Sequence, residues 1–480
     1  MLTRTSLKRN LLAPHTLNLF LLVLFTVIGT ILRFYRLGYQ SFWYDEAASI
    51  LDANNSLYNI SHPPLSYVIL RVFLEVFGTN EFTARLPACL FGIITIPLVY
   101  LFGKQLFGEK EGLVASFIIS VFPWYVRWSQ EVRMYTELTV FTILALYFFH
   151  HAVHKKTITF YVLSAIFVIL AFYTHYSGAL ILGIIIFWLT SKRFLENRNS
   201  STNYKHLVIF FGLCVILALP LVFITIPQTL TFKLGSSAYR WGSPIHKYFL
   251  MLFKDAFGPT LSLFSIVGAI YLISQRNSVG YLLTAYAAIP VFTFAALTFI
   301  TNVAIRYVLF TLPAFALLTA RLIIEIYEII MKGESAKEFR IIMLNNLDLN
   351  RFLALGFLFT VVISVANLPG LYNYYSEETH SDWKSACAYV ESMRNPEDLV
   401  AATDDKVVYY YLGKIDFKLS VELFKPSVFE EIKNSHERVW LLIGRGIRNI
   451  DPDYEFRNWL ESDCELMNKV DDITIYLFTP

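Results

Sequence analysis

Charged residues are scarce in this sequence. Lysine, arginine, aspartate and glutamate make up 16% of the 480 residues, and hydrophobic residues make up 56%, whereas an ordinary soluble protein is roughly 25% charged. The net charge of +3 is small for this length, and no dense basic stripe with interleaved aromatic residues is present, so we expect no nucleic acid as a partner. The composition predicts a polytopic membrane protein.

Cysteine is also rare. The chain has four cysteines: Cys89 and Cys214 lie in apolar runs, and Cys387 and Cys464 lie in the polar C-terminal part. No two of them have the spacing of metal ligands, and a disulfide between the last two stays open.

Long apolar runs, by contrast, are abundant. A helix needs about 20 apolar residues to cross a bilayer, and runs near that length predict about eleven spans. They cover 17–35, 82–102, 112–126, 135–153, 157–173, 176–190, 206–226, 257–274, 279–299, 304–329 and 350–368. The shorter segment Leu65–Phe77 contains Arg71 and Glu75, and we predict a helix that lies in the membrane interface. No small-residue cleavage site follows the first run, so we expect it to be retained as a span.

The basic residues of the short connections predict the orientation. If the N-terminus is cytoplasmic, the Lys and Arg residues near 4–9, 104–110, 155–156, 192–205, 276 and 332–340 fall on one side, as the positive-inside rule expects. The first long loop (about 36–81) and the turns near 130, 175 and 304 then face the other side. These separate loops are expected to converge on one extracytoplasmic surface of a bacterial or archaeal plasma membrane.

The last part of the chain changes character. Residues 369–480 are polar and contain short strand patterns at Leu399–Ala402, Val439–Ile443 and Ile473–Phe478, with a helical pattern at 382–393. We therefore predict an all-α polytopic membrane bundle over 1–368 and a small extracytoplasmic α/β domain over 369–480.

Two adjacent acids follow the first span. Asp45 and Glu46 point in different directions in any regular structure, so one can act as a base while the other has a structural or metal-binding role. The alternative is a solvated acid pair. His62 precedes Pro63 and Pro64, which fix its place at the membrane surface. It can bind a phosphate or a sugar hydroxyl, or simply precede a helix start.

Three further groups lie on the same predicted face. The segment 128–135 carries Glu131, Arg133 and Tyr135, and an arginine at that depth pairs well with a lipid-linked phosphate. An internal ion pair between Glu131 and Arg133 is the alternative. His175 lies in a tight turn between two tyrosines. Arg306 and Tyr307 stand at the mouth of a long span, where the arginine either shares a phosphate charge or anchors the helix at the lipid surface.

In this order, the motifs resemble those of the C-type glycosyltransferases that use lipid-phosphosugar donors, and more closely the branch of the protein O-mannosyltransferases and lipid A aminoarabinose transferases. The resemblance covers most of residues 17–330. It rests on Trp43-Tyr44-Asp45-Glu46, His62-Pro63-Pro64-Leu65, Glu81 to Pro87, Ser129-Gln130-Glu131-x-Arg133-Met134-Tyr135, Thr174-His175-Tyr176 and Arg306-Tyr307.

The resemblance implies an inverting transfer of a sugar from a polyprenyl-phosphate monosaccharide to an acceptor hydroxyl. It makes Asp45 the catalytic base, beside Glu46, and it assigns the donor phosphate to Arg133, Arg306 and Tyr307. The substrate-binding residues would be His62, Glu131, Tyr135 and His175. The partners implied are the lipid donor, membrane lipids and an acceptor that is a protein, a lipid or an envelope glycan.

The sequence is compatible with the presence or the absence of a metal cofactor and with more than one function. No cofactor is certain; a divalent metal is possible, with Asp45 and Glu131 as oxygen ligands. The chain lacks the large lumenal repeat domains of eukaryotic O-mannosyltransferases. An oligosaccharide ligase or polymerase, with a larger donor, is the main alternative. A transporter of a lipid-linked sugar would place charges at mid-membrane, and a binding protein without catalysis would lose the base.

Overall fold

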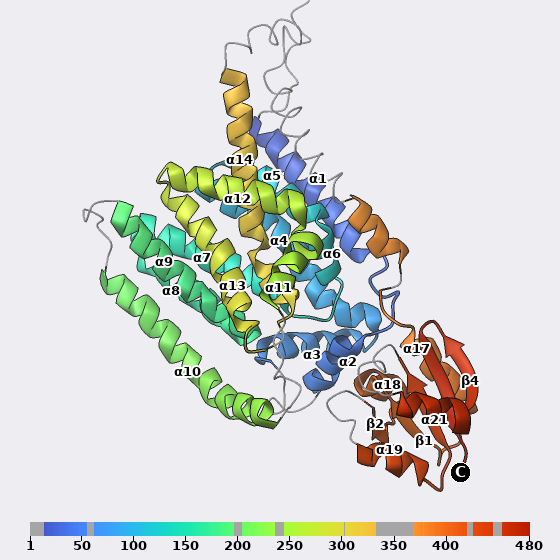
Figure 1. Cartoon of the computed structure of the whole chain (residues 1–480). Helices are drawn as coiled ribbons and strands as arrows, with labels where there is room; N and C mark the ends of the chain where they lie inside the picture. The colour runs from blue at the N-terminus through green and yellow to red at the C-terminus, as the bar shows by residue number, and fades with distance from the viewer. Residues whose placement is uncertain are drawn as a thin grey trace, which may run out of the picture.

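The computed structural model of the chain is mostly helical, with a small sheet near the C-terminus (Figure 1). It describes residues 14–54, 62–195, 204–235, 244–301, 303–332, 368–377, 379–419, 426–444 and 454–480. The bundle consists of α1 (Pro14–Phe34), α4 (Glu81–Leu106), α5 (Glu109–Val121), α6 (Pro123–Trp128), α7 (Tyr135–Lys155), α8 (Ile158–Thr174), η1 (Tyr176–Ala179), α9 (Leu180–Leu195), α10 (Tyr204–Gly235), α11 (Ile245–Met251), η3 (Leu252–Ala256), α12 (Gly258–Ser274), α13 (Ser278–Leu297), η4 (Ile305–Thr311) and α14 (Leu312–Lys332).

Among the described residues, seven helices are long and apolar enough to cross a membrane, and an eighth span results if the bent pair of 245–256 and 258–274 counts as one. Of the eleven predicted spans, eight match these helices, 157–173 forms the shorter apolar helix α8, 112–126 is broken, and all of 350–368 except its last residue lies outside the described residues. The predicted span 112–126 is divided, because Pro123 begins α6 and the residue before a proline disfavours helix. The protein is therefore an integral, multi-pass membrane protein.

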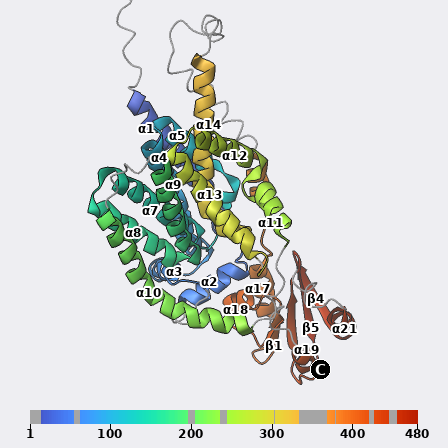
Figure 2. The ribbon, with the colours of Figure 1, turned by 60° about the vertical axis from the view of Figure 1, so that its left-hand side comes forward.

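The bundle has a protected centre and an apolar surface. In the span that ends in α14, 83% of the most apolar window is buried, whereas in α10 only 17% is. Figure 2 shows α10 at the outside of the bundle and α14 next to α12 and α13. The exposed apolar face of α10 is what a lipid-facing helix requires.

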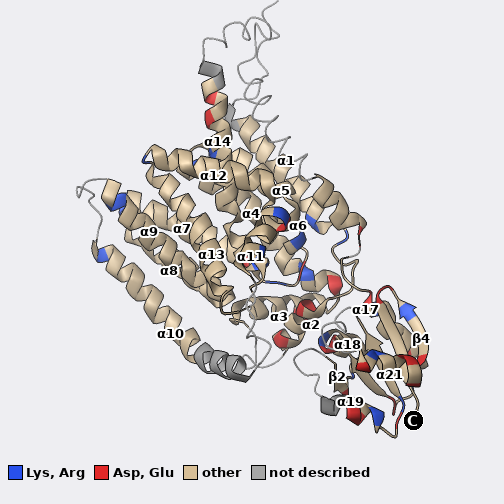
Figure 3. Cartoon of the chain, viewed as in Figure 1, with Lys and Arg blue, Asp and Glu red and all other residues tan. Residues whose placement is uncertain are grey.

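Two short helices close one end of the bundle. They are α2 (Tyr44–Asn54) and α3 (Leu65–Phe77), and α3 has the bounds that its sequence predicted. In Figures 1 and 2 they lie at the end opposite to the start of α1 and the end of α14. The charged segments also gather near α2 and the C-terminal part, while the bodies of the long helices carry few (Figure 3).

The C-terminal part is a five-stranded sheet with helices. Its elements are α17 (Trp383–Met393), β1 (Leu399–Ala402), α18 (Asp405–Leu412), β2 (Phe417–Lys418), α19 (Pro426–Lys433), β3 (Val439–Ile443), α21 (Glu455–Asp463), β4 (Glu465–Val470) and β5 (Ile473–Phe478). The strand order is β2-β1-β3-β5-β4, with β1 parallel to β2 and β3, and β5 antiparallel to β3 and β4. The three predicted strands are confirmed. Cys387 and Cys464 are both free thiols, so the disulfide left open by the sequence does not form here.

The C-terminal part and the first loop share one hydrophobic core. Phe42 and Ile50 of the loop pack in the same buried cluster as Trp440 and Ile475 of the sheet. Polar contacts reinforce this junction: the backbone N–H of Phe42 donates to the Tyr411 hydroxyl, which itself donates to Glu81 at 3.0 Å. A domain boundary at 368/369 stays a prediction, but the two parts are packed together over the loop that carries Asp45.

Candidate active site

The first turn of α2 separates the two adjacent acids. Asp45 and Glu46 both lie in this turn, where the positive end of the helix dipole favours negative charge. Successive positions of a helix are rotated by about 100°, so the two side chains diverge, as their adjacency predicted. The Glu46 side chain is fully buried, whereas that of Asp45 is 24% exposed.

Glu46 holds an arginine of the second span. Nε and Nη2 of Arg85 donate to the two carboxylate oxygens at 2.8 and 2.7 Å, and the backbone N–H of Val132 donates to one of them at 2.9 Å. The same guanidinium donates to carbonyl groups within 37–41. This buried cluster ties the first loop to α4 and to the segment before α7.

Asp45 pairs with the arginine at the mouth of the last described span. Nη2 of Arg306 donates to Asp45 Oδ2 at 2.8 Å, and its Nε donates to the Tyr135 hydroxyl at 3.1 Å. The guanidinium lies 5.5 Å from the ring centre of Trp43 and 5.7 Å from that of Trp128, within the range of cation–π attraction. These contacts place the guanidinium of Arg306 inside the site. The alternative role of this arginine, as an anchor at the lipid surface, is not needed to explain its position.

Arg133, which lies just before α7, also contacts α2. Its Nη1 donates to Ser49 Oγ at 3.0 Å and to the Asp45 carbonyl at 3.4 Å, and its Nη2 lies 3.1 Å from His62 Nε2. A guanidinium can only donate, so His62 Nε2 accepts and the ring proton sits on Nδ1. Burial, with help from the charges of Arg133 and Arg306 and from His175, lowers the pKa of His62 well below its usual value, which keeps the ring neutral.

Two buried donors of this pair have no partner among the described residues. They are Nδ1 of His62 and Nε of Arg133. An unsatisfied buried donor costs about 1–3 kcal/mol, so the arrangement gains stability if an acceptor enters. An anion with several oxygens is an acceptor that suits N–H groups of this kind.

Aromatic rings complete this side of the site. The ring of His175 stacks on that of His62 at 5.5 Å and lies 5.4 Å from Tyr307 and 6.1 Å from Tyr135. The backbone N–H of Ser177 donates to His175 Nδ1 at 3.2 Å. Burial and the neighbouring Arg133 and Arg306 lower the pKa of His175 to about 3, so this ring is also neutral and presents Nε2–H.

Glu131 belongs to a different group. It does not pair with Arg133: its carboxylate accepts from the Trp43 indole N–H and lies 3.3 Å from Nε2 of His380 and 3.7 Å from Nε of Arg127. Although burial alone would raise the pKa of Glu131, His380 and the two nearby arginines outweigh it and lower this pKa. Burial likewise opposes the charge of His380, but Glu131 and Glu46 raise its pKa above the usual 6.5.

One trio of these residues has ligand atoms close enough for a metal ion. Oxygens of Glu46 and Glu131 and a nitrogen of His380 all lie within 4.8 Å of one another. Yet both Glu46 oxygens already accept from Arg85, and Nδ1 of His380 faces the Ser41 carbonyl at 3.2 Å, which requires a proton there. The donor set fits an ion-pair cluster better than a metal centre, and Asp45, the other predicted ligand, is not a member of the trio.

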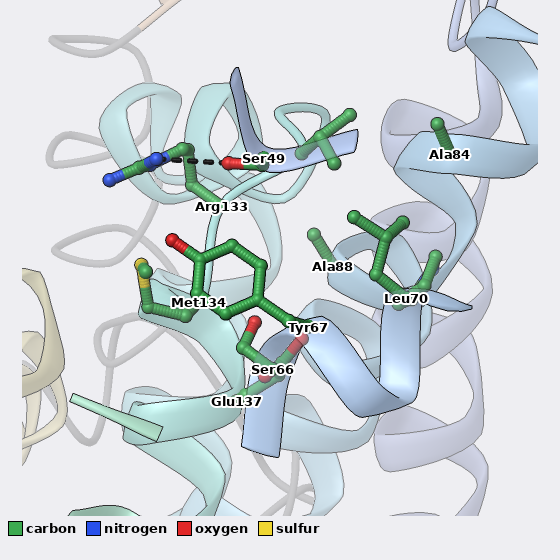
Figure 4. Close-up of a pocket in the computed structure, with 11 residues that line it drawn as sticks. Ser49, Ser66, Tyr67, Leu70, Ala84, Ala88, Arg133, Met134 and Glu137 are labelled. Atoms are coloured by element: carbon green, nitrogen blue, oxygen red, sulfur yellow. Dashed lines mark hydrogen bonds between the residues drawn. The ribbon is translucent and has the colours of Figure 1, made fainter. Parts of the chain in front are cut away.

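A cavity of about 520 Å³ opens beside the pair of Asp45 and Arg306. Arg306, Trp43 and Trp128 line it, together with residues of η3 and of the C-terminal segment 379–404. A second, smaller pocket lies between α2, α3, α4 and α7 and has room for about one water molecule. Figure 4 shows Arg133 bonded to Ser49 at this pocket, with Tyr67 and Glu137 below them.

The structure thus brings together most of the predicted site residues. Asp45, Arg133, Tyr135, Arg306, Tyr307, His62 and His175 form one connected group, whereas Glu46 and Glu131 lie in the adjoining ion-pair cluster. Sequence reasoning missed Arg85 and His380 as individual residues. An arginine inside a predicted span is a signal that could have singled out Arg85; the histidine in the polar C-terminal part carries no comparable signal.

Comparisons with known proteins agree with this fold. Residues 61–222 match a family model described as dolichyl-phosphate-mannose-protein mannosyltransferase. An uncharacterized protein of Aquifex aeolicus is 30% identical over 187 residues, which are 35% of this chain and 37% of that protein. A putative mannosyltransferase of Bacillus subtilis, YkcB, is 26% identical over 185 residues, 37% of this chain and 25% of that protein. The chain thus matches well under half the length of either relative.

Solved structures extend the likeness to nearly the whole chain. Apo ArnT from Cupriavidus metallidurans superposes with a TM-score of 0.65 at 13% identity, over 95% of this chain and 97% of that one. The oligosaccharyltransferase AglB from Archaeoglobus fulgidus, in complex with an inhibitory peptide and a dolichol-phosphate, gives 0.58 at 13% identity, over 94% and 72%. The predicted resemblance to the C-type glycosyltransferases is confirmed, and the chain has their fold.

Proposed function

We propose that this protein is an integral membrane glycosyltransferase that moves a sugar from a polyprenyl-phosphate monosaccharide to an acceptor hydroxyl, with inversion at the anomeric carbon. The observation that carries the proposal is the group around Asp45: a partly exposed carboxylate, 2.8 Å from Arg306, with two unsatisfied donors on the neighbouring Arg133 and His62. Base and phosphate-binding groups are thereby close together.

Asp45 would act as the catalytic base. It accepts the proton of the acceptor hydroxyl while that oxygen bonds to the anomeric carbon. The bond from this carbon to the phosphate oxygen breaks, and the polyprenyl phosphate leaves with the electron pair. Arg306 orients Asp45, because its Nη2 donates to Asp45 Oδ2 at 2.8 Å.

The donor phosphate would bind between Arg133, His62 and Arg306. Negative charge builds on the leaving phosphate in the transition state, so donors placed in advance at that point lower the barrier. His62 is neutral and contributes an N–H, while the two arginines contribute charge. Glu46, with both oxygens on Arg85, would hold the loop in place and not take part in the chemistry.

The lipid part of the donor is inferred from the structural neighbours. ArnT has been solved bound to undecaprenyl phosphate, with a TM-score of 0.60 to this chain, and AglB with a dolichol-phosphate. A monosaccharide donor is favoured over an oligosaccharide because the chain covers 97% of ArnT but only 72% of the oligosaccharyltransferase. The positive-inside rule supports an extracytoplasmic site in a bacterial or archaeal plasma membrane.

The test is the Asp45→Asn variant in lipid nanodiscs. With radiolabelled polyprenyl-phosphate mannose as donor, and the acceptor fraction of the cell envelope, we expect the release of polyprenyl phosphate to fall by about 10²–10⁴-fold, the range of general base catalysis. Glu75→Gln on the exposed face of α3 is the matched control and should keep full activity. Full activity of Asp45→Asn would remove the base assignment.

A further inference from the structure

The donor site does not account for the cavity of about 520 Å³ that borders Arg306, the partner of Asp45. Asp45, Arg133, His62 and His175 do not line it, but Arg306, which lies 2.8 Å from Asp45, does. Two of the proposed phosphate-binding groups, Arg133 and His62, therefore lie outside the cavity, and the third, Arg306, borders it. If the proposed function holds, this is where the acceptor reaches the base.

The walls of this cavity are unusually aromatic. The five aromatic residues that line it are Trp43, Tyr44, Trp124, Trp128 and Trp383. Four lining residues are aliphatic, namely Met251 and the consecutive Val303, Ala304 and Ile305, so aromatic residues outnumber them by one. Flat indole faces suit the apolar C–H faces of a sugar ring, whose edges stay polar.

Polar groups stand at separate points around these rings. Asp404 is the N-cap of α18 but makes no side-chain cap bond, and it accepts from the Thr403 hydroxyl at 3.2 Å. Asp255 lies in the π-helical turn η3, a type of irregularity that is frequent at functional sites. Each of these carboxylates can accept a hydrogen bond from a hydroxyl. A few polar groups among aromatic walls are typical of a small-molecule pocket, and the volume of this cavity is in the usual range.

The same lining argues against an extended peptide. Two common modes of peptide binding use main-chain bonds to a sheet edge or insertion of a helix into an apolar groove. The C-terminal residues that line the cavity come from 379–383 and from Asp404, and none belongs to a strand. Among the described residues, the cavity thus offers no sheet edge to a peptide.

We infer that this cavity binds a carbohydrate acceptor, with Trp124 and Trp383 as ring platforms and Asp404 as a hydroxyl acceptor, so that the C-terminal part selects the acceptor. The inference rests on the proposed function for its chemistry. A hydroxyl of the bound sugar loses its proton to Asp45 and takes the donor sugar. The acceptor class is therefore a glycan or the sugar head group of a lipid, not a polypeptide.

Binding is the decisive measurement, because it does not need turnover. The probes are methyl α-mannoside, methyl β-glucoside and methyl N-acetyl-β-glucosaminide, titrated into the Asp45→Asn protein in nanodiscs while tryptophan fluorescence is recorded. We expect at least one glycoside to bind saturably. Adding Trp124→Leu or Asp404→Asn should weaken that binding by about tenfold, the change that one lost contact of about 1.4 kcal/mol gives.

Matched controls use residues outside the cavity. Trp459→Leu removes an indole that is buried to a similar degree as that of Trp124 but lies in a separate hydrophobic core of the C-terminal part. Asp471→Asn changes an exposed turn residue whose left-handed backbone asparagine tolerates. Neither should change glycoside binding. Two results would overturn the inference. One is that no glycoside binds but a peptide rich in serine and threonine does; the other is that both cavity variants bind glycosides as tightly as the parent protein.

Turnover separates this inference from the proposed function. With wild-type protein and the lipid donor, transfer to a glycoside should show an acceptor KM that rises in Asp404→Asn and a donor KM that does not. Donor consumption that is the same in wild type and Asp45→Asn would contradict the proposed reaction, whatever the cavity binds. Donor consumption that depends on Asp45, with transfer only to peptide, would contradict the carbohydrate assignment alone.

Discussion

Asp45 and Glu46 show how strongly the environment of a single residue decides its role. The two carboxylates are chemically alike and adjacent, yet one has both oxygens on a buried guanidinium and the other stays accessible beside Arg306. A carboxylate saturated by fixed donors cannot readily take up a proton, while one with free lone pairs can. The arrangement supports the proposal that Glu46 holds the loop in place and Asp45 acts as the base.

At this scale, Arg133 offers the clearest test of the phosphate site. Arg133→Ala removes buried N–H groups that would bind the phosphate of the lipid donor. The free-energy barrier that kcat/KM for this lipid reports should therefore rise by about 2–4 kcal/mol. Arg71→Ala is the control: its ion pair with Glu75 is exposed, and such pairs contribute about 0–1 kcal/mol. Unchanged donor kinetics in Arg133→Ala would return this residue to a purely structural role.

The Arg85–Glu46 pair should matter for stability more than for chemistry. Arg85→Met leaves the Glu46 carboxylate buried without its cation, and removing one partner of a buried pair costs about 3–5 kcal/mol. Thermal unfolding in nanodiscs measures this loss. The double variant Arg85→Met with Glu46→Gln should recover part of it, because no uncompensated charge remains. Equal stability of the single and double variants would contradict the ion-pair account.

At the scale of elements, close approach of helices depends on glycine. A Cβ on Gly103 of α4 would lie 2.7 Å from the Cα of Gly112 in α5, so the two backbones must be in contact there. Small residues at helix interfaces permit such packing in membranes. The bend between the pair of helices at 245–274 has a comparable requirement, since Gly258 has a φ of +71°.

Gly103→Ala should therefore destabilise the bundle. The clash is with backbone, which cannot rotate away, and overpacking of this kind costs about 1–3 kcal/mol. Gly212→Ala in α10 is the control, because a Cβ there meets nothing within 4 Å; it should be neutral or slightly stabilising, by about 0.5–1 kcal/mol. Thermal unfolding of both variants is the measurement, and equal melting temperatures would refute the packing argument.

Secondary structure followed the local pattern closely where the pattern was strong. The bounds of α3 and of three strands agree with the predicted ranges because apolar periodicity and Gly or Pro boundaries act over a few residues. The break between α5 and α6 shows the limit: an apolar run predicts a span by composition, but Pro123 stops the helix at Val121.

At the scale of the whole molecule, the C-terminal part holds the loop that precedes α2 in place. Gln40 accepts from the Thr379 hydroxyl at 2.9 Å, the Ser41 hydroxyl donates to the Ser381 carbonyl at 3.0 Å, and His380 sits between Ser41 and Glu131. Loop and sheet also share a hydrophobic core. The position of Asp45 thus depends on residues more than 330 places away in the chain.

This attachment should depend on pH. The pKa of His380 is raised in the folded protein, where it faces Glu131, Glu46 and, with opposite effect, Arg85. Its contribution to stability is therefore present below the ordinary value near 6.5 and is lost as the pH rises through the raised value. Hydrogen exchange in 379–383, corrected for the intrinsic pH effect, should show weaker protection at high pH than at pH 6.

Glu131→Gln is the control for this behaviour. It removes the main carboxylate partner of His380 and should abolish the pH dependence of exchange in that segment. If wild type and Glu131→Gln show the same pH dependence, His380 is not the group that titrates.

The sequence by itself determined the membrane class, the helices, the three clearest strands and the residue types of the site, because these follow from composition and from patterns within a few residues. Only the tertiary structure decided which acid is buried and which is accessible, that Glu131 pairs with His380 and not with Arg133, and that the C-terminal part lines the cavity. The partners of a charged side chain depend on how distant segments pack together, and a local sequence pattern does not contain that information.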